Sequence, residues 1–216
     1  MHLPDGLLPA WACGTGYGLT GLLTWFSLRQ INRQADPSQG IPKAALLTAA
    51  FFVASSLRIP LPPASVHLVL NGLLGVVLGY YAIPAILVGL FLQAVLLGHG
   101  GLTTLGLNTV IMGVPALLAY FLFQLRYHLG QREPTPWLTA IFAFISGCLG
   151  LSLALLIFWG LILLTLPNDL DQGAERLAVY GLVIAHLPIV GLEGFFTALL
   201  VLFLQRVKPK LIEGGL

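Results

Sequence analysis

Seven apolar segments constrain the fold of this chain more than any other feature of its sequence. Only 8% of its 216 residues are charged and 57% are hydrophobic, whereas about a quarter of the residues in a soluble domain are charged. So few polar residues cannot cover a globular protein in water. The sequence therefore predicts an all-α integral membrane protein, with one polytopic domain over residues 1–216. The predicted spans are Leu7–Leu28, Ala44–Leu57, Leu68–Gly79, Ile83–Leu97, Asn108–Leu125, Leu138–Leu166 and Leu177–Leu204.

Three of these segments are shorter than the roughly 20 residues that a membrane-spanning helix needs. The last two of these short segments, Leu68–Gly79 and Ile83–Leu97, could instead form one 30-residue helix, Leu68–Leu97, kinked at Pro84. Basic residues distinguish the two topologies, because cytoplasmic loops are enriched in Lys and Arg. Seven spans with an external N-terminus place eight of the ten Lys and Arg residues in cytoplasmic loops, whereas six spans divide them four against six. We therefore expect about seven spans in the plasma (inner) membrane, with the N-terminus outside.

This topology places three histidines on the external side. His2 lies in the N-terminal segment, His67 ends the proline-rich loop that starts at Arg58, and His99 lies in the glycine-rich stretch GHGGLTTLG. The proline-rich loop should be a stiff, extended connector, since proline fixes φ and restricts the residue before it. The glycine-rich stretch is nearly uncharged, and we expect that it can re-enter the membrane against protein or a cavity.

The first two residues can form a metal chelate. No basic region precedes the first apolar segment, as a secretory signal would require, so we expect the first helix to stay. We also expect Met1 to be retained, because initiator methionine is usually removed only before small residues and His2 is not small. The Met1 amino nitrogen, the His2 amide nitrogen and the His2 Nδ1 atom can bind one metal in a plane, and His67 is the obvious fourth donor. Square-planar nitrogen sites favour Ni(II) or Cu(II), whereas zinc prefers tetrahedral ligands. Alone, each histidine has an ordinary structural explanation. Their shared side and the lack of other soft ligands leave a metal site and a structural role equally open for the pair.

For the other polar residues, two roles are open. Asp5 can cap the first helix or accept a hydrogen bond from the His2 ring. Asn71 and Asn108 can each cap a helix N-terminus or be a buried hydrogen-bond partner. His186 and Glu193 lie seven residues apart inside the last span, where ionisable groups are costly and are candidates for function. We expect them to bond to a neighbouring helix, with an acid–base pair as the alternative.

Several motifs are absent, and their absence narrows the function. The chain has no GxxxxGK[ST], HExxH or GxSxG motif, so we expect no ATP hydrolysis and none of these hydrolase chemistries. It has no basic stretch dense enough to bind nucleic acid. Cys13 and Cys148 lie in apolar runs without CxxC spacing and are expected to be packing residues. The segment Ala44–Leu57 carries alanines four apart, which could dock a partner helix.

Four stretches together resemble the CbiM/NikM family, the substrate-binding membrane subunits of energy-coupling-factor transporters for cobalt and nickel. They are MHLPDG, SVHLVLNGLLG, GHGGLTTLGLNTVIMG and AHLPIVGLEGFFTAL, and the resemblance runs from Met1 to about Phe203. It implies a metal-binding N-terminal loop and an extra first helix within residues 1–28, added to a six-helix core over residues 29–207. It also implies that Met1, His2 and His67 hold the metal.

The same resemblance implies a transport subunit that has no ATPase of its own. Ni(II) or Co(II) would be the transported substrate, captured outside, and His99 and Asn108 would line or cover the site. Asp5 and Asn71, from their own positions in the sequence, are candidates to support it. The implied partners are a membrane coupling subunit, two ATP-binding cassette subunits and often a small accessory membrane protein, in membrane lipid and without nucleic acid.

Two alternatives belong to other classes. One is a membrane enzyme that uses His186 and Glu193 as an acid–base pair and does not need Met1 or His2. The other is a vitamin-type transport subunit of the same architecture, with an aromatic-lined external pocket.

Overall fold

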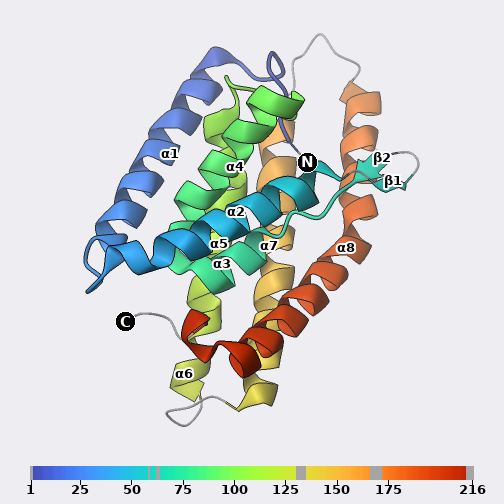
Figure 1. Cartoon of the computed structure of the whole chain (residues 1–216). Coiled ribbons are helices and arrows are strands. Elements are labelled where there is room, and N and C mark those ends of the chain that lie inside the picture. Colours follow the sequence, from blue (N-terminus) through green and yellow to red (C-terminus); the bar gives the residue numbers. More distant parts are fainter. Residues whose placement is uncertain (1, 58, 62–63, 130–134, 166–171, 213–216) are drawn as a thin grey trace.

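The part of the chain that the structure describes is a helical bundle with one short β-hairpin (Figure 1). The structure is a computed structural model and describes residues 2–57, 59–61, 64–129, 135–165 and 172–212. Its helices are α1 (Ala10–Ile31), α2 (Ile41–Ser56), α3 (Asn71–Leu78), α4 (Ala82–Leu97), α5 (Leu105–Gln124), α6 (Arg126–Leu129), α7 (Pro136–Thr165) and α8 (Gln172–Val207). The strands β1 (Ile59–Leu61) and β2 (Ala64–Val66) pair antiparallel. The all-α class is confirmed, although the hairpin replaces part of the expected extended connector. Met1, Arg58 and Leu166, which the predictions used, lie outside the described residues.

The chain is a membrane protein. Within the described residues, four helical stretches are long and apolar enough to cross a membrane, namely Asn71–Leu97, Leu105–His128, Pro136–Thr165 and Tyr180–Val207. Large apolar side chains are also exposed along α1 and α8; Trp25 and Phe195, for example, are both 60% exposed. Such a surface needs lipid or a partner to cover it. The count of seven spans and the external N-terminus stay predictions.

The chain reverses direction between α3 and α4. From Asn71 to Gly79 the chain contacts successively later residues of α5: Asn71 contacts Met112, Gly75 contacts Ala116, and Gly79 contacts Tyr120. Ile83 of α4 then contacts Gly113, which lies earlier in α5. Gly79 has φ 57° and ψ −124°, a conformation that glycine adopts more easily than other residues. The break in the apolar stretch Asn71–Leu97 is therefore at Gly79 and not at Pro84, as the one-helix alternative assumed. Pro84 lies in the first turn of α4, where its missing N–H costs little.

The segment His67–Leu70 lies deep inside the bundle although it is not helical. It leads into α3, which begins opposite the middle of α5 and α7, where Asn71 Nδ2 donates to the carbonyls of Met112 (3.2 Å) and Gly150 (2.9 Å). Leu70 has a φ of 55°, which is uncommon for a residue other than glycine. Non-helical backbone at membrane depth is tolerated where protein buries it, and both His67 and Leu70 are buried.

Helix α5 is central to the bundle and contacts α1, α3, α4 and α7. Glycines allow the close approach, because a Cβ at Gly75 would overlap the Ala116 carbonyl, and one at Gly16 would overlap the first turn of α5. Small residues thus allow close helix packing at Gly75, whereas Gly14 and Gly18 face open space. The α1–α5 contact brings the segment before α1 next to the loop before α5.

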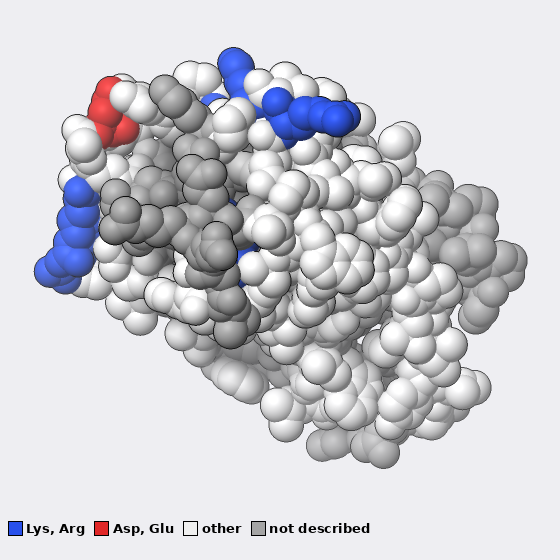
Figure 2. All heavy atoms as spheres, turned by 90° about the horizontal axis from the view of Figure 1, so that it is seen from below, with Lys and Arg blue, Asp and Glu red and all other residues white. Residues whose placement is uncertain are grey.

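The end of the bundle that carries α6 is basic. Figure 2 views the molecule from this end and shows Lys and Arg side chains gathered there. Lys43 Nζ donates to the carbonyl of Leu211 (3.0 Å), and Arg126 donates to that of Ile212 (3.0 Å). These bonds fasten the C-terminal segment to the basic end, whereas the N-terminal residues lie closer to the other end (Figure 1).

Candidate metal centre

Asn108 holds the N-terminal segment through its backbone. The Leu3 amide donates to Asn108 Oδ1 (2.9 Å), and Asn108 Nδ2 donates to the Leu3 carbonyl (3.1 Å). The Thr104 hydroxyl donates to the same carbonyl (2.6 Å). Of its two predicted roles, Asn108 therefore has that of a buried hydrogen-bond partner. Residues 2 and 3 are thereby positioned against the start of α5.

Asp5 does not cap the first helix. Its carboxylate accepts from the backbone amides of Leu102 (3.2 Å) and Thr103 (2.8 Å) and from the Thr103 hydroxyl (2.5 Å), whereas α1 begins after Pro9 without a side-chain cap. The Thr103 hydroxyl is the main cause that lowers the pKa of Asp5, and the backbone amides add to it. Asp5 thus ties the N-terminal segment to the α4–α5 loop, which places that loop, including His99, beside the N-terminus.

Four histidine rings from distant parts of the chain are linked by contacts between pairs, and we call this set the histidine row. The His2 ring is stacked 5.2 Å from the His67 ring and 6.4 Å from the His99 ring, measured between centroids. The His186 ring lies 6.4 Å from the His67 ring, at 89° to it. The prediction put His2, His67 and His99 on one side of the membrane, and the structure brings their rings together. His186, which we expected only to bond to a helix, extends the row into α8.

Burial keeps the central histidines neutral. It lowers the pKa of His67 to about 3 and lowers the pKa of His2 well below its ordinary value. The Nε2 atom of His2 is buried and has no hydrogen-bond partner among the described residues. A neutral imidazole is the form that binds a metal, so both rings are in the ligand state near pH 7.

Gln93 lies beside His2 and connects it to α2. Its side-chain hydrogen bonding opposes the effect of burial on the pKa of His2. Its Nε2 atom donates to the Ser55 hydroxyl and to the Phe52 carbonyl (3.3 Å) on α2. Its Oε1 atom is buried without a hydrogen-bond partner in the described part of the chain. Sequence analysis did not single out Gln93, although a lone amide within an apolar segment was a usable signal.

Asn71 and Glu193 position the segment that carries His67. Asn71 bonds to the backbones of α5 and α7, and its Oδ1 atom accepts from the Gly72 amide (3.0 Å), so it fixes the start of α3. Glu193 Oε1 accepts from the amides of Val69 and Leu70 (3.1 Å for Leu70). We predicted that Glu193 bonds to a neighbouring helix, but its bonds go to the non-helical segment before α3. These bonds replace the backbone partners that a helix would have supplied.

His186 and Glu193 do not form an acid–base pair. Seven residues of α-helix separate them by roughly 10 Å along the axis. The His186 Nδ1 atom lies 2.8 Å from the Leu182 carbonyl one turn before it, while Glu193 bonds to the segment before α3. Nothing in this arrangement favours the membrane-enzyme alternative.

The side chains alone do not complete a metal site. Within the described residues, no group of three or more His, Cys, Asp or Glu side chains is placed to hold one metal ion. A metal at His2 and His67 would therefore need nitrogen ligands from the backbone or from the terminal amine, the set that the Met1-His2 chelate supplies. Met1 itself lies outside the described residues.

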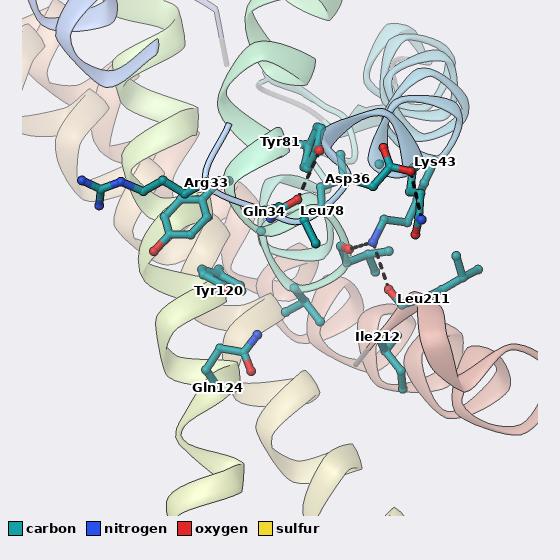
Figure 3. Close-up of a pocket in the computed structure, with 17 residues that line it drawn as sticks. Arg33, Gln34, Asp36, Lys43, Leu78, Tyr81, Tyr120, Gln124, Leu211 and Ile212 are labelled. Atoms are coloured by element: carbon teal, nitrogen blue, oxygen red, sulfur yellow. Dashed lines mark hydrogen bonds between the residues drawn. The ribbon is translucent and has the colours of Figure 1, made fainter. Parts of the chain in front are cut away.

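A cavity of about 680 Å³ lies at the basic end and not at the histidines. Arg33, Lys43, Tyr81, Tyr120 and Gln124 are among the residues that line it. Figure 3 shows Lys43 pointing toward the C-terminal segment. Its Nζ atom also donates to the carbonyl of Val77 in α3 (2.8 Å). The Tyr81 hydroxyl donates to the Pro37 carbonyl (2.6 Å). These bonds join the α1–α2 loop, α2, the end of α3 with the turn after it, and the C-terminal segment at the cavity wall.

Comparison with known proteins points in the same direction as the histidine row. Residues 2–211 match the profile of a family described as "Cobalt uptake substrate-specific transmembrane region". A "Putative metal transport protein" of Haemophilus influenzae is 32% identical over 216 residues, which cover 99% of this chain and 97% of that protein. The "Fused nickel transport protein NikMN" of Rhodobacter capsulatus is also 32% identical, over 98% of this chain and 64% of the longer fused protein. A crystal structure described as a truncated transition metal transporter has the same fold, with a TM-score of 0.72 and 24% identity over 95% of this chain and 99% of that one.

Proposed function

The chain belongs to the CbiM family of cobalt-uptake substrate-specific transmembrane proteins, and from that premise we propose that it captures Ni(II) or Co(II) for an ATP-driven importer. The observation that carries this proposal is the stacked pair of His2 and His67, 5.2 Å apart. One ring belongs to the second residue of the chain and the other to a buried non-helical segment. The family match supports a role in cobalt uptake.

The proposed site has four nitrogen ligands. They are the amino group of Met1, the amide and Nδ1 atoms of His2, and one imidazole nitrogen of His67. The His67 Nδ1 atom lies 3.2 Å from the Leu68 carbonyl, and because a carbonyl only accepts hydrogen bonds, Nδ1 carries the proton in the neutral ring. The Nε2 atom of His67 therefore presents the lone pair. Histidine ligands commonly donate their second nitrogen to a backbone carbonyl in this way.

Such a site selects by geometry. A planar set of four nitrogens suits Ni(II), Cu(II) and related ions, whereas Mg²⁺ and Ca²⁺ require six or more oxygen ligands. The metal must also displace the proton of the His2 amide, which hard cations do poorly. The substrate is therefore a transition-metal ion taken up from outside the plasma membrane.

Energy for transport would come from partners. Because the sequence has no phosphate-binding GxxxxGK[ST] loop, two ATP-binding cassette subunits would hydrolyse ATP, and a membrane coupling subunit would connect them to this chain. A small accessory membrane protein completes the proposed complex. Ala45, Ala49 and Ala50 are exposed on α2, and this small-residue face is the proposed contact with the coupling subunit.

The decisive experiment changes only the terminal amine. Calorimetric titration with Ni(II) and Co(II) would compare the chain with a free Met1 amine, the chain with one residue added before Met1, and the chain with the same residue added after Leu216. We expect one equivalent of metal to bind the first and third proteins, and affinity to fall by at least about tenfold in the second. Equal binding by all three would contradict the proposed ligand set, and no metal binding by any would favour the vitamin-type alternative.

A further inference from the structure

His186 has the local arrangement of a metal ligand, although the four-nitrogen site does not use it. Its side chain is fully buried in α8, where an ionisable group is costly and usually functional. Its Nδ1 atom lies 2.8 Å from the Leu182 carbonyl. Because the carbonyl only accepts, Nδ1 carries the proton in the neutral ring, and Nε2 presents the lone pair.

That lone pair is buried without a donor. The Nε2 atom of His186 has no hydrogen-bond partner among the described residues, and a buried polar atom without a partner costs free energy. A histidine kept only for packing would be expected to use both nitrogens. The Nε2 atom is thus available to an electron-pair acceptor inside the bundle.

The neighbouring ring is that of His67. Both histidines have Nδ1 at a backbone carbonyl, of Leu68 and Leu182 respectively, as metal-ligating histidines commonly do. Their ring centroids are 6.4 Å apart. Two imidazoles that share one metal have centroids roughly 4.5–6.5 Å apart, because each metal–nitrogen bond is about 2.0–2.1 Å. The two rings are therefore close enough to hold one ion between them.

We propose that His67 and His186 form a second metal station, to which Ni(II) or Co(II) passes from the N-terminal site during transport. This inference rests on the proposed function. In the transfer, the bonds from the metal to the Met1 amine, the His2 amide and the His2 imidazole break, and the His2 amide takes back a proton from water. The bond to His67 remains, and a bond to His186 Nε2 forms, so the ion is never released uncoordinated.

The contacts of His67 support this direction of transfer. Its ring contacts the rings of both His2 and His186, and His186 belongs to a helix that ends at the basic end of the bundle. Glu193 lies two turns further along α8, and its Oε2 atom is buried without a partner in the described residues. The same helix thus offers a lone pair and then a carboxylate oxygen to a cation that moves away from the N-terminus.

The first test removes the N-terminal site and looks for the second. In the chain with one residue added before Met1, we expect Ni(II) to bind at least about tenfold more weakly and without the absorption spectrum of a square-planar site. His186→Phe in this extended chain should abolish the remaining binding. His186→Gln should do the same, and it serves if the phenylalanine variant folds poorly, because glutamine can still donate to the Leu182 carbonyl. Thr197→Val is the matched control, because Thr197 is also a buried polar residue of α8 without a hydrogen bond from its Oγ1 atom.

The second test measures transport. With a free Met1 amine, His186→Phe should bind Ni(II) with unchanged affinity and spectrum, but its uptake into cells with the complete transporter should fall by at least about tenfold. Normal uptake by His186→Phe, or unchanged weak binding when His186 is replaced in the extended chain, would overturn the second station. An extended chain that binds as tightly as the native one would instead overturn the proposed N-terminal site, so the two failures are distinguishable.

Discussion

Polar side chains around the histidine row hold backbone groups that no helix or strand satisfies. Asn108 bonds to Leu3, Asp5 to the α4–α5 loop, and Glu193 to the segment before α3. The neutral bonds of Asn108 each contribute only about 0.5–1.5 kcal/mol to stability. Their larger effect is on the site, because each one fixes a segment that carries a histidine.

Replacing Asn108 by Leu should weaken metal binding without unfolding the bundle. The leucine has a similar volume but cannot bond to the amide and carbonyl of Leu3, so the bonds that hold residues 2 and 3 beside His67 are lost. We expect Ni(II) affinity to fall about 10–100-fold, measured by calorimetry. The control is Asn32→Ala, at the exposed end of α1. Unchanged affinity in Asn108→Leu would show that the N-terminal segment positions itself.

Gln93 should act on the metal through the His2 ring. If Nδ1 of His2 binds the metal, its Nε2 atom carries a proton and needs an acceptor, and the Gln93 Oε1 atom has no other partner among the described residues. Gln93→Leu should therefore lower Ni(II) affinity about tenfold. Ser55→Ala removes the α2 partner of Gln93 and should leave affinity nearly unchanged. Equal loss in both variants would assign the effect to the α2–α4 contact instead.

Helix α8 holds the non-helical segment before α3 in place through hydrogen bonds that its Glu193 side chain accepts. This helix contacts α7 most extensively and reaches α3 and β2 through the same face. Glu193 satisfies two consecutive amides there, and Leu70 keeps its unusual φ of 55° beside them. A movement of α8 would therefore move His67, which makes this helix the natural route by which partners act on the site.

Glu193→Leu should destabilise the bundle more than Glu193→Gln. Leucine leaves the amides of Val69 and Leu70 buried without an acceptor, which costs about 1–3 kcal/mol for each group, whereas the glutamine oxygen can still accept. The measurement is thermal unfolding of the detergent-purified protein followed by circular dichroism. Similar midpoints for the two variants would mean that other groups satisfy these amides.

The whole molecule is polarised, with His2 and His99 toward one end and basic residues at the other. The rings of His2 and His99 lie close together, whereas Lys43 and Arg126 bond to the C-terminal segment. Lys and Arg enrichment marks the cytoplasmic side of membrane proteins. The reversal at Gly79 sends α3 and α4 in opposite directions along α5.

Side-specific labelling checks this orientation. In a variant with Cys13 and Cys148 replaced by Ala, a membrane-impermeant maleimide added to intact cells should modify Leu102→Cys but not Ser38→Cys. Both positions are exposed; the first is in the α4–α5 loop and the second in the α1–α2 loop. Permeabilised cells, in which both should react, serve as the control. The reverse pattern would place the N-terminus inside and contradict metal capture from outside.

The class of the protein, its family, and the shared side of His2, His67 and His99 could all be predicted from the sequence. Apolar content and the positions of Lys and Arg along the chain are read directly from the sequence, so they do not depend on how the helices pack. The Met1-His2 chelate is equally local, because its donors are covalent neighbours.

Only the tertiary structure decided which groups meet. Leu3 bonds to a residue 105 positions away, Asp5 reaches the α4–α5 loop, and His186 faces His67. The reversal at Gly79 likewise depends on contacts with α5. The reason is that helices in lipid are apolar on every side, so their sequences carry little periodicity to show which face points inward. Close glycine contacts and long-range hydrogen bonds set those faces, and they exist only once the helices have packed.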